Sequence, residues 1–167
     1  MPKGPGTPHD EDLNPGHYIN ILDDQTAFGV PLTPLPITRQ AYDSALRVNS
    51  SDEYKGGYLP YSIVDGWQQL QKDFAYWRVD LRGEGFASSA DHREWFAKDR
   101  NLREMLIIRD LGYWSHFVAD GSQPMHSSVH YDGWGNYPNP NDYTTQKGFH
   151  AYFEGGSCGS TRRMRRC

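Results

Sequence analysis

Hydrophobic residues recur at helical spacing in the middle of the chain. After Pro60, an apolar side chain returns at every third or fourth position, which places these side chains on one face of a helix of about five turns. The positions are Ile63, Trp67, Leu70, Phe74, Trp77 and Leu81. Gly83 and Gly85 are expected to end this helix, because glycine is unfavourable in helix interiors.

A second long helix is expected after Ser88 and Ser89, which offer N-cap side chains together with Asp91. Gly121 and Pro124 should close it, so that it runs to about residue 119. Its apolar positions are Trp95, Leu102, Leu106 and Tyr113. Two consecutive long helices favour a helical fold class.

The other segments read mainly as loops. Residues 1–60 contain eight of the eleven prolines and no sustained apolar period, which predicts extended loops with one short helix around Thr38–Arg47. Residues 131–148 are rich in Gly, Pro, Asn and Asp and predict an ordered loop, and residues 148–154 predict the first turns of a further helix. No segment alternates cleanly as a strand would. The prediction is an all-α, multi-helix domain with long ordered loops.

The chain has 167 residues, the length of one domain, and its 37% hydrophobic and 14% aromatic content argues against disorder. No signal peptide or transmembrane segment is recognisable, which leaves the localisation open. The formal charge of −4 conceals an asymmetry, because four arginines lie in the last twelve residues while all 21 acidic residues precede them. Residues 1–154 therefore carry 13 basic and 21 acidic side chains, a charge of −8.

The segment 156–167 changes composition abruptly and is expected to be a disordered Arg/Cys tail outside the fold. An alternative is a basic arm that contacts nucleic acid. Both cysteines, Cys158 and Cys167, lie there, which excludes a disulfide framework for the rest of the chain.

Candidate metal ligands cluster between residues 116 and 154. His116 and Asp120 are four residues apart, and so are His150 and Glu154; side chains at this spacing share one helix face and can meet one cation. His126 lies between the two pairs. A single pair of this kind is usually a surface pair or a buried, hydrogen-bonded histidine, but two pairs flanking a third histidine predict a metal cluster.

Other candidates are weaker. His130 suits a supporting or surface role, and His92, at a helix start, suits a cap. The dipeptide His9-Asp10 lies among prolines and glycines, where a helix is not expected. No Gly-rich phosphate loop, zinc-protease motif or nucleophile elbow occurs.

The run His116-Phe-Val-Ala-Asp-Gly-Ser-Gln-Pro-Met-His126, followed by Gly148-Phe-His-Ala-Tyr-Phe-Glu154, resembles the zinc core of a known superfamily. That superfamily contains the single-strand-specific zinc nucleases of the S-one/P-one type and the bacterial zinc-dependent phospholipases C. The sequence around residues 57–66, 114–116 and 130–140 looks most like bacterial members of the nuclease branch. The resemblance spans about residues 9–155 and predicts one partial domain there.

The resemblance implies three zinc ions in a helical cleft of an intact member. His17, His116 and Asp120 match ligands of the first zinc, and Asp120 also matches the carboxylate that reaches the third. The protein ligands of the second zinc match the set His126, His150 and Glu154. Asp120 then takes the catalytic position, where the attacking water is shared, and Tyr18 matches an aromatic residue that can stack on a base.

Several family features are not recognisable. Family members begin, after signal removal, with a tryptophan that binds the third zinc, and they carry a further aspartate on the first; Asp10 and Asp12 do not have the spacing of that aspartate. The chain is therefore expected to be incomplete at both ends and to bind one or two zinc ions. The resemblance also implies that full-length relatives are exported. The implied function is endonucleolytic cleavage of single-stranded DNA and RNA to 5′-phosphates. The alternatives are a zinc-dependent phospholipase C, with phospholipid as substrate, and an inactive zinc-binding fragment; no feature indicates a protein partner.

Overall fold

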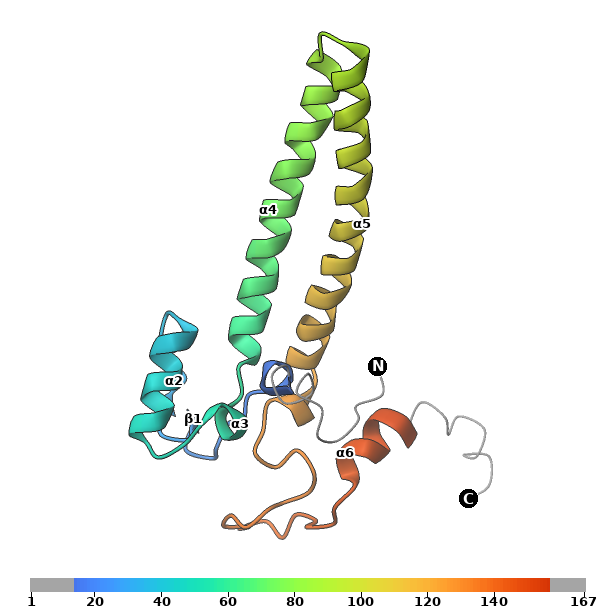
Figure 1. Ribbon diagram of the computed structural model, residues 1–167. Helices are drawn as coiled ribbons and strands as arrows, with labels where there is room; N and C mark the ends of the chain where they lie inside the picture. Colours follow the sequence, from blue (N-terminus) through green and yellow to red (C-terminus); the bar gives the residue numbers. More distant parts are fainter. Residues whose placement is uncertain (1–13, 157–167) are drawn as a thin grey trace, which may run out of the picture. The chain divides into compact units, whose positions relative to one another are not determined.

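The computed structural model describes residues 14–156, which fall into two compact units. The first unit comprises residues 14–58 and 121–156, and the second comprises residues 59–120. Helices make up most of the second unit, the first unit combines short helices with loops, and the strands in the described residues are two short ones (Figure 1). The predicted all-α class is confirmed. The predicted residues His9, Asp10 and Asp12 and the tail from residue 157 lie outside the described residues.

The second unit is a hairpin of two long helices, α4 (Leu59–Phe86) and α5 (Ala90–Gly121, whose last residue belongs to the first unit) (Figure 1). Polar contacts join the helices along their length. Trp77 Nε1 donates to Glu104 Oε1 at 3.0 Å, and Trp114 Nε1 donates to the Ile63 carbonyl at 3.1 Å. Arg103 forms an ion pair with the buried Asp80. Both predicted helices are thus present.

Helix α4 is longer than the apolar pattern predicts. It continues through Gly83 and Gly85 to Phe86, so the expected stop at the glycines is wrong. Gly83 has a packing role instead: a Cβ built there would lie 2.6 Å from Phe96 Cδ1 of α5. Glycine lets the two helices approach at a point where a side chain would separate them.

The apolar stripe of α4 is only partly covered within residues 14–156. Leu70 is buried, whereas Trp67, Phe74 and Leu81 remain about half exposed. Part of the buried surface of α4 is polar and includes Asp73 and Asp80. The spacing of apolar residues therefore predicts helix α4 correctly, but it does not predict which of its side chains are buried within residues 14–156.

Helix α5 begins as its cap predicts. Ser89 Oγ accepts a hydrogen bond from the His92 N–H at 3.2 Å, so this serine satisfies one of the unpaired donors of the first turn. Asp91 lies within the first turn rather than at the cap. The last two turns of α5 carry His116 and Asp120.

The first unit contains α2 (Arg39–Val48), which confirms the short helix predicted around Thr38–Arg47. Thr38 caps it by accepting from the Ala41 N–H at 3.1 Å. A shorter helix, α3 (Glu53–Gly56), follows, and Asp52 caps it. The core consists of side chains that are almost fully buried: Ile19, Ala27, Val30, Tyr42 and Leu46.

The elements of this unit that were not predicted include α3 and a hairpin of β1 (Thr26–Ala27) with β2 (Val30–Pro31). The hairpin turns at Phe28 and Gly29, whose φ angles of 50° and 84° are both positive. This is the backbone geometry of a two-residue β-turn that favours Asn-Gly or Asp-Gly. Phenylalanine at the first position hides that signal in the sequence.

The ligand-bearing segments of the first unit are short turns: η1 (Asn14–His17), η2 (Pro124–His126), α6 (Phe149–Ala151) and the π-helical turn η3 (Tyr152–Gly156). An extended segment after η1 ties η2 in place. The Ile19 N–H donates to the His126 carbonyl at 2.8 Å, and the Val129 N–H donates to the Ile21 carbonyl at 3.1 Å. The predicted turns of residues 148–154 are confirmed, with a π-helical continuation in place of further α-helix.

The loop between η2 and α6 is closed by its own side chains, as the prediction of an ordered loop requires. The Trp134 N–H donates to the Thr144 carbonyl at 2.8 Å, and its ring stacks on Tyr143 with centroids 4.8 Å apart. Nearer the tip, Asn139 bonds the backbone of Tyr143 through both of its amide atoms. The loop is therefore pinned across residues 134–144.

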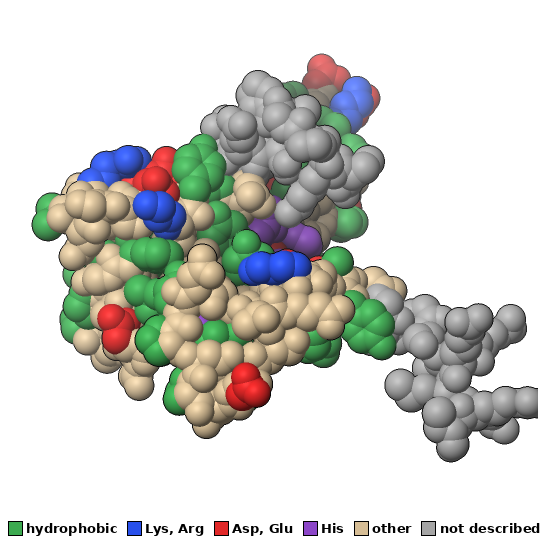
Figure 2. All heavy atoms as spheres, turned by 90° about the horizontal axis from the view of Figure 1, so that it is seen from below, with side chains coloured by type: hydrophobic (Ala, Val, Ile, Leu, Met, Phe, Trp, Pro, Cys, Tyr) green, Lys and Arg blue, Asp and Glu red, His purple; other side chains and the backbone are tan. Residues whose placement is uncertain are grey.

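Apolar side chains also lie at the surface. In Figure 2 they appear among polar side chains on the face drawn. In the first unit, Tyr131, Tyr143 and Phe149 are 41–51% exposed. Among the helices of residues 14–156, none combines the length and apolar character needed to cross a bilayer.

Candidate metal centre

His126 is placed by a short turn that its own sequence encodes. Gln123 caps η2 by accepting from the Met125 N–H, and Pro124 occupies the first turn, where its missing N–H is not needed. The His126 N–H then bonds the Gln123 carbonyl at 2.9 Å. The Gln-Pro-Met-His run thus forms a tight turn that presents the imidazole of His126 after the end of α5.

One ring nitrogen of His126 is taken up by a backbone acceptor. Its Nδ1 lies 2.7 Å from the backbone carbonyl oxygen of His17. A carbonyl only accepts, so Nδ1 carries a hydrogen, and Nε2 is the ring nitrogen that remains for Glu154, His150 or a metal ion. Metal-binding histidines almost always donate their second ring nitrogen in this way. The sequence does not predict this contact, because a backbone acceptor leaves no trace in residue type.

His150 and Glu154 lie on the helical turns after Gly148. Gly148 has a φ of 89°, a conformation that glycine adopts without strain, and it begins α6. His150 Nε2 lies 2.8 Å from Glu154 Oε1. The predicted spacing of four residues therefore places both donor atoms together.

The three predicted ligands of the second zinc converge in the first unit. His126 Nε2 is 2.9 Å from Glu154 Oε1 and 3.2 Å from His150 Nε2, although 24 residues separate the two histidines. Each residue points one nitrogen or oxygen ligand atom at the same small volume. Ligands bound tetrahedrally at zinc–nitrogen distances of ~2.0–2.1 Å would lie about 3.3 Å apart, so the arrangement fits a zinc ion after only a slight expansion.

The charge and exposure of this cluster suit a cation. Burial by itself would raise the pKa of Glu154, but hydrogen bonds from His150 and His126 outweigh burial, so the pKa of this carboxyl lies below its ordinary value. The His126 and His150 side chains are 15% and 25% exposed, and that of Glu154 is 45% exposed. The cluster thus offers a carboxylate at neutral pH and is open to solvent on the side of Glu154.

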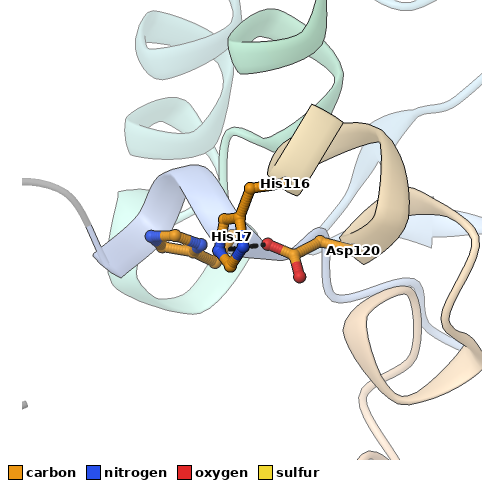
Figure 3. A group of neighbouring side chains, drawn as sticks. All are labelled: His17, His116 and Asp120. Atoms are coloured by element: carbon orange, nitrogen blue, oxygen red, sulfur yellow. Dashed lines mark ion pairs between the residues drawn. The ribbon is translucent and has the colours of Figure 1, made fainter. Parts of the chain in front are cut away.

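His116 and Asp120 face each other on the last two turns of α5. His116 Nε2 lies 3.3 Å from Asp120 Oδ2, the contact marked by the dashed line in Figure 3. The Asp120 side chain is 12% exposed and that of His116 is 57% exposed. The predicted i, i+4 pair is present. His17, also labelled in Figure 3, ends η1 in the first unit, and its predicted place in a shared first-zinc site stays a prediction.

Tyr18 packs within the first unit. Its hydroxyl donates to the Tyr54 carbonyl at 2.8 Å. Burial, with smaller contributions from Tyr131 and neighbouring acidic groups, raises the pKa of its phenol to about 12. The structure gives this tyrosine a role in packing, and its stacking on a base stays a prediction.

His130 supports the loop rather than the cluster. Its Nε2 lies 3.0 Å from Asp23 Oδ1, and its ring stacks on Trp134 with centroids 3.6 Å apart. The supporting or surface role expected for His130 beside a metal site stays a prediction. His92 lies at the start of α5, where Ser89 caps its N–H.

No protein-family model, curated protein or solved structure matches this chain significantly. The resemblance to the zinc nucleases therefore stays a prediction that rests on the ligand motif.

Proposed function

We propose that this chain is a zinc-dependent phosphodiester hydrolase in which His126, His150 and Glu154 bind one zinc ion. The observation that carries the proposal is the convergence of their three donor atoms within 2.8–3.2 Å of one another. The hydrogen bond from His126 to the His17 carbonyl supports it, because it occupies Nδ1 and directs Nε2 toward the other two ligands.

The donor set also indicates a catalytic rather than a structural type of site. Structural zinc sites are closed by four protein ligands, usually including cysteines, whereas catalytic sites use three and leave one position open. Two histidines and one glutamate are such a set. Zinc held there would supply a Lewis acid that activates water and neutralises charge on a phosphodiester.

The charge of the loaded centre would attract the substrate. Glu154 and the two histidines leave a net charge of about +1 on the loaded site, which attracts a phosphate even though residues 1–154 carry −8. Asp120, ion-paired with His116 on α5, is the carboxylate that we propose to orient the attacking water.

Single-stranded DNA and RNA are the substrates we favour, with 5′-phosphates as products. The ligand set is common to nucleases and phospholipases C, but the sequence beside it resembles the nuclease branch. A single strand can bend into an open site without the cost of separating two strands. We expect one or two zinc ions per chain.

Metal content tests the binding step. The purified chain should retain at least one zinc, and His126→Ala should remove one equivalent. His92→Ala is the matched control, because this exposed histidine lies in α5 and belongs to neither ligand pair. Unchanged zinc content in His126→Ala would show that the ligand assignment is wrong.

Substrate assays test the reaction. The zinc-loaded chain should cleave a single-stranded oligonucleotide, lose activity with a chelator and regain it with zinc. Phosphatidylcholine vesicles are assayed in parallel. Turnover of lipid alone would contradict the nuclease assignment in favour of a phospholipase C, and zinc binding without either activity would identify a non-catalytic zinc-binding chain.

A further inference from the structure

A carboxylate in the loop before α6 is bonded to the backbone that carries His150. Asp132 Oδ1 accepts a hydrogen bond from the Gly148 N–H at 2.8 Å and a second from the His150 N–H at 3.3 Å. One oxygen atom therefore contacts both the first residue of the turn and a proposed zinc ligand.

This contact replaces a cap that α6 lacks. The N-cap residue is Gly148, which has no side chain with which to satisfy the free N–H groups of the first turn. Asp132 supplies the acceptor from 16 residues away. Its negative charge also complements the positive end of the short helix.

The segment around Asp132 is itself fixed. The Tyr131 ring meets the His150 ring edge-on, with centroids 6.0 Å apart. Gly133 has a φ of 84°, and a Cβ there would lie 3.1 Å from the Gln146 carbonyl carbon. Since glycine allows this close approach, residues 131–133 lie against both His150 and the backbone of Gln146, which precedes α6.

We propose that Asp132 is a positioning residue of the zinc site. By holding the backbone at residues 148 and 150, its carboxylate sets the direction in which His150 presents Nε2 to His126 and Glu154. The inference rests on the proposed zinc site. Without Asp132, the first turn of α6 must be ordered when the metal binds, and that entropy cost lowers the affinity.

Zinc affinity, measured by competition with a chromophoric chelator, tests the role directly. All variants are made in a parent chain that carries His116→Ala. This substitution removes a ligand of the other predicted site, and the His116 side chain is 57% exposed. In this parent, Asp132→Ala should raise the zinc dissociation constant about tenfold, the low end for partners that orient a ligand. Asp132→Asn keeps the Oδ1 acceptor and should stay within about threefold of the parent.

Thr38→Ala is the matched control. Thr38 also caps a helix of the first unit, by accepting from the Ala41 N–H at 3.1 Å, but it caps α2 rather than α6. It should lower the stability of the metal-free chain to a similar degree and leave zinc affinity unchanged. This comparison separates positioning of His150 from a general loss of stability.

The outcomes distinguish the two proposals. If the parent binds zinc and Asp132→Ala binds it equally well, the positioning role is wrong and the zinc site stands. The role is also wrong if Thr38→Ala weakens binding as much as Asp132→Ala, or if Asp132→Asn fails to restore it. A parent that binds no zinc would overturn the zinc site and this inference together.

Discussion

Replacing Gly57 with alanine should loosen the region that supports His126. Gly57 follows α3 and has a φ of 79°, and its missing side chain leaves room for the backbone of Tyr18. A Cβ there would lie 2.7 Å from Tyr18 Cδ2 and 2.8 Å from the Tyr18 carbonyl carbon, closer than real Cβ contacts. The neighbouring residue, His17, provides the carbonyl that orients His126.

Two costs add in this variant. Placing a residue with a Cβ at φ 79° and ψ 164°, a backbone conformation essentially restricted to glycine, costs roughly 1–3 kcal/mol. Forcing extra volume against a packed backbone costs roughly 1–3 kcal/mol more. We therefore expect Gly57→Ala to lower the local stability by about 2–6 kcal/mol. Because the displaced backbone adjoins His17, zinc affinity should fall as well.

Hydrogen exchange measured on peptides from residues 14–22 and 53–58 is the assay. A loss of 2 kcal/mol corresponds to roughly 30-fold faster exchange of the protected amides. Gly112→Ala is the control, since nothing lies within 4 Å of a Cβ at this helical position of α5. That variant should stabilise α5 by up to about 1 kcal/mol and leave these peptides unchanged. Unchanged exchange in Gly57→Ala would refute the close approach of Tyr18.

Two further predictions concern stability. Hydrogen bonds from Trp77 and Arg100 lower the pKa of Glu104 below its ordinary value. The contribution of Glu104 to folding stability is therefore complete when the pH is above the ordinary pKa, and it disappears as the pH falls through the pKa of the folded state. Glu104→Gln should therefore flatten the acid side of the stability–pH curve of the helix hairpin, and an unaltered curve in thermal melts would contradict this. Replacing Leu46, which is fully buried in the first unit, with alanine should lower the free energy of unfolding by about 2–5 kcal/mol. A decrease of less than about 1 kcal/mol in urea unfolding would contradict the place of Leu46 in a closed core.

The sequence predicts the helices well because their signals are local. The apolar period after Pro60, the cap at Ser89 and the short helix after Thr38 each depend on residues within a few turns, and each appears in the structure. The pairs His116–Asp120 and His150–Glu154 belong to the same class, since four residues span one helical turn.

Contacts between distant residues were harder to predict. Asp132 is an ordinary loop aspartate in the sequence, and only the folded chain brings it to the His150 N–H. Gly83 looks like a helix stop, yet it allows Phe96 to approach. The hairpin turn at residues 28–29 has the backbone of a favoured turn without its usual residues. In each case the deciding partner, or the backbone angle, is absent from local sequence.

Because the loop between η2 and α6 is closed by its own contacts, the number of residues between His126 and His150 need not determine how their side chains are arranged in space. Trp134 and Asn139 fasten its tip, while Asp132 and the extended segment of residues 19–21 fasten its base. Closing a longer loop costs only ~0.6 kcal/mol for each doubling of its length. An insertion between residues 140 and 142, inside the turn that Asn139 and Tyr143 close, should therefore leave the cluster unchanged, and this tip is a suitable place for a spectroscopic tag.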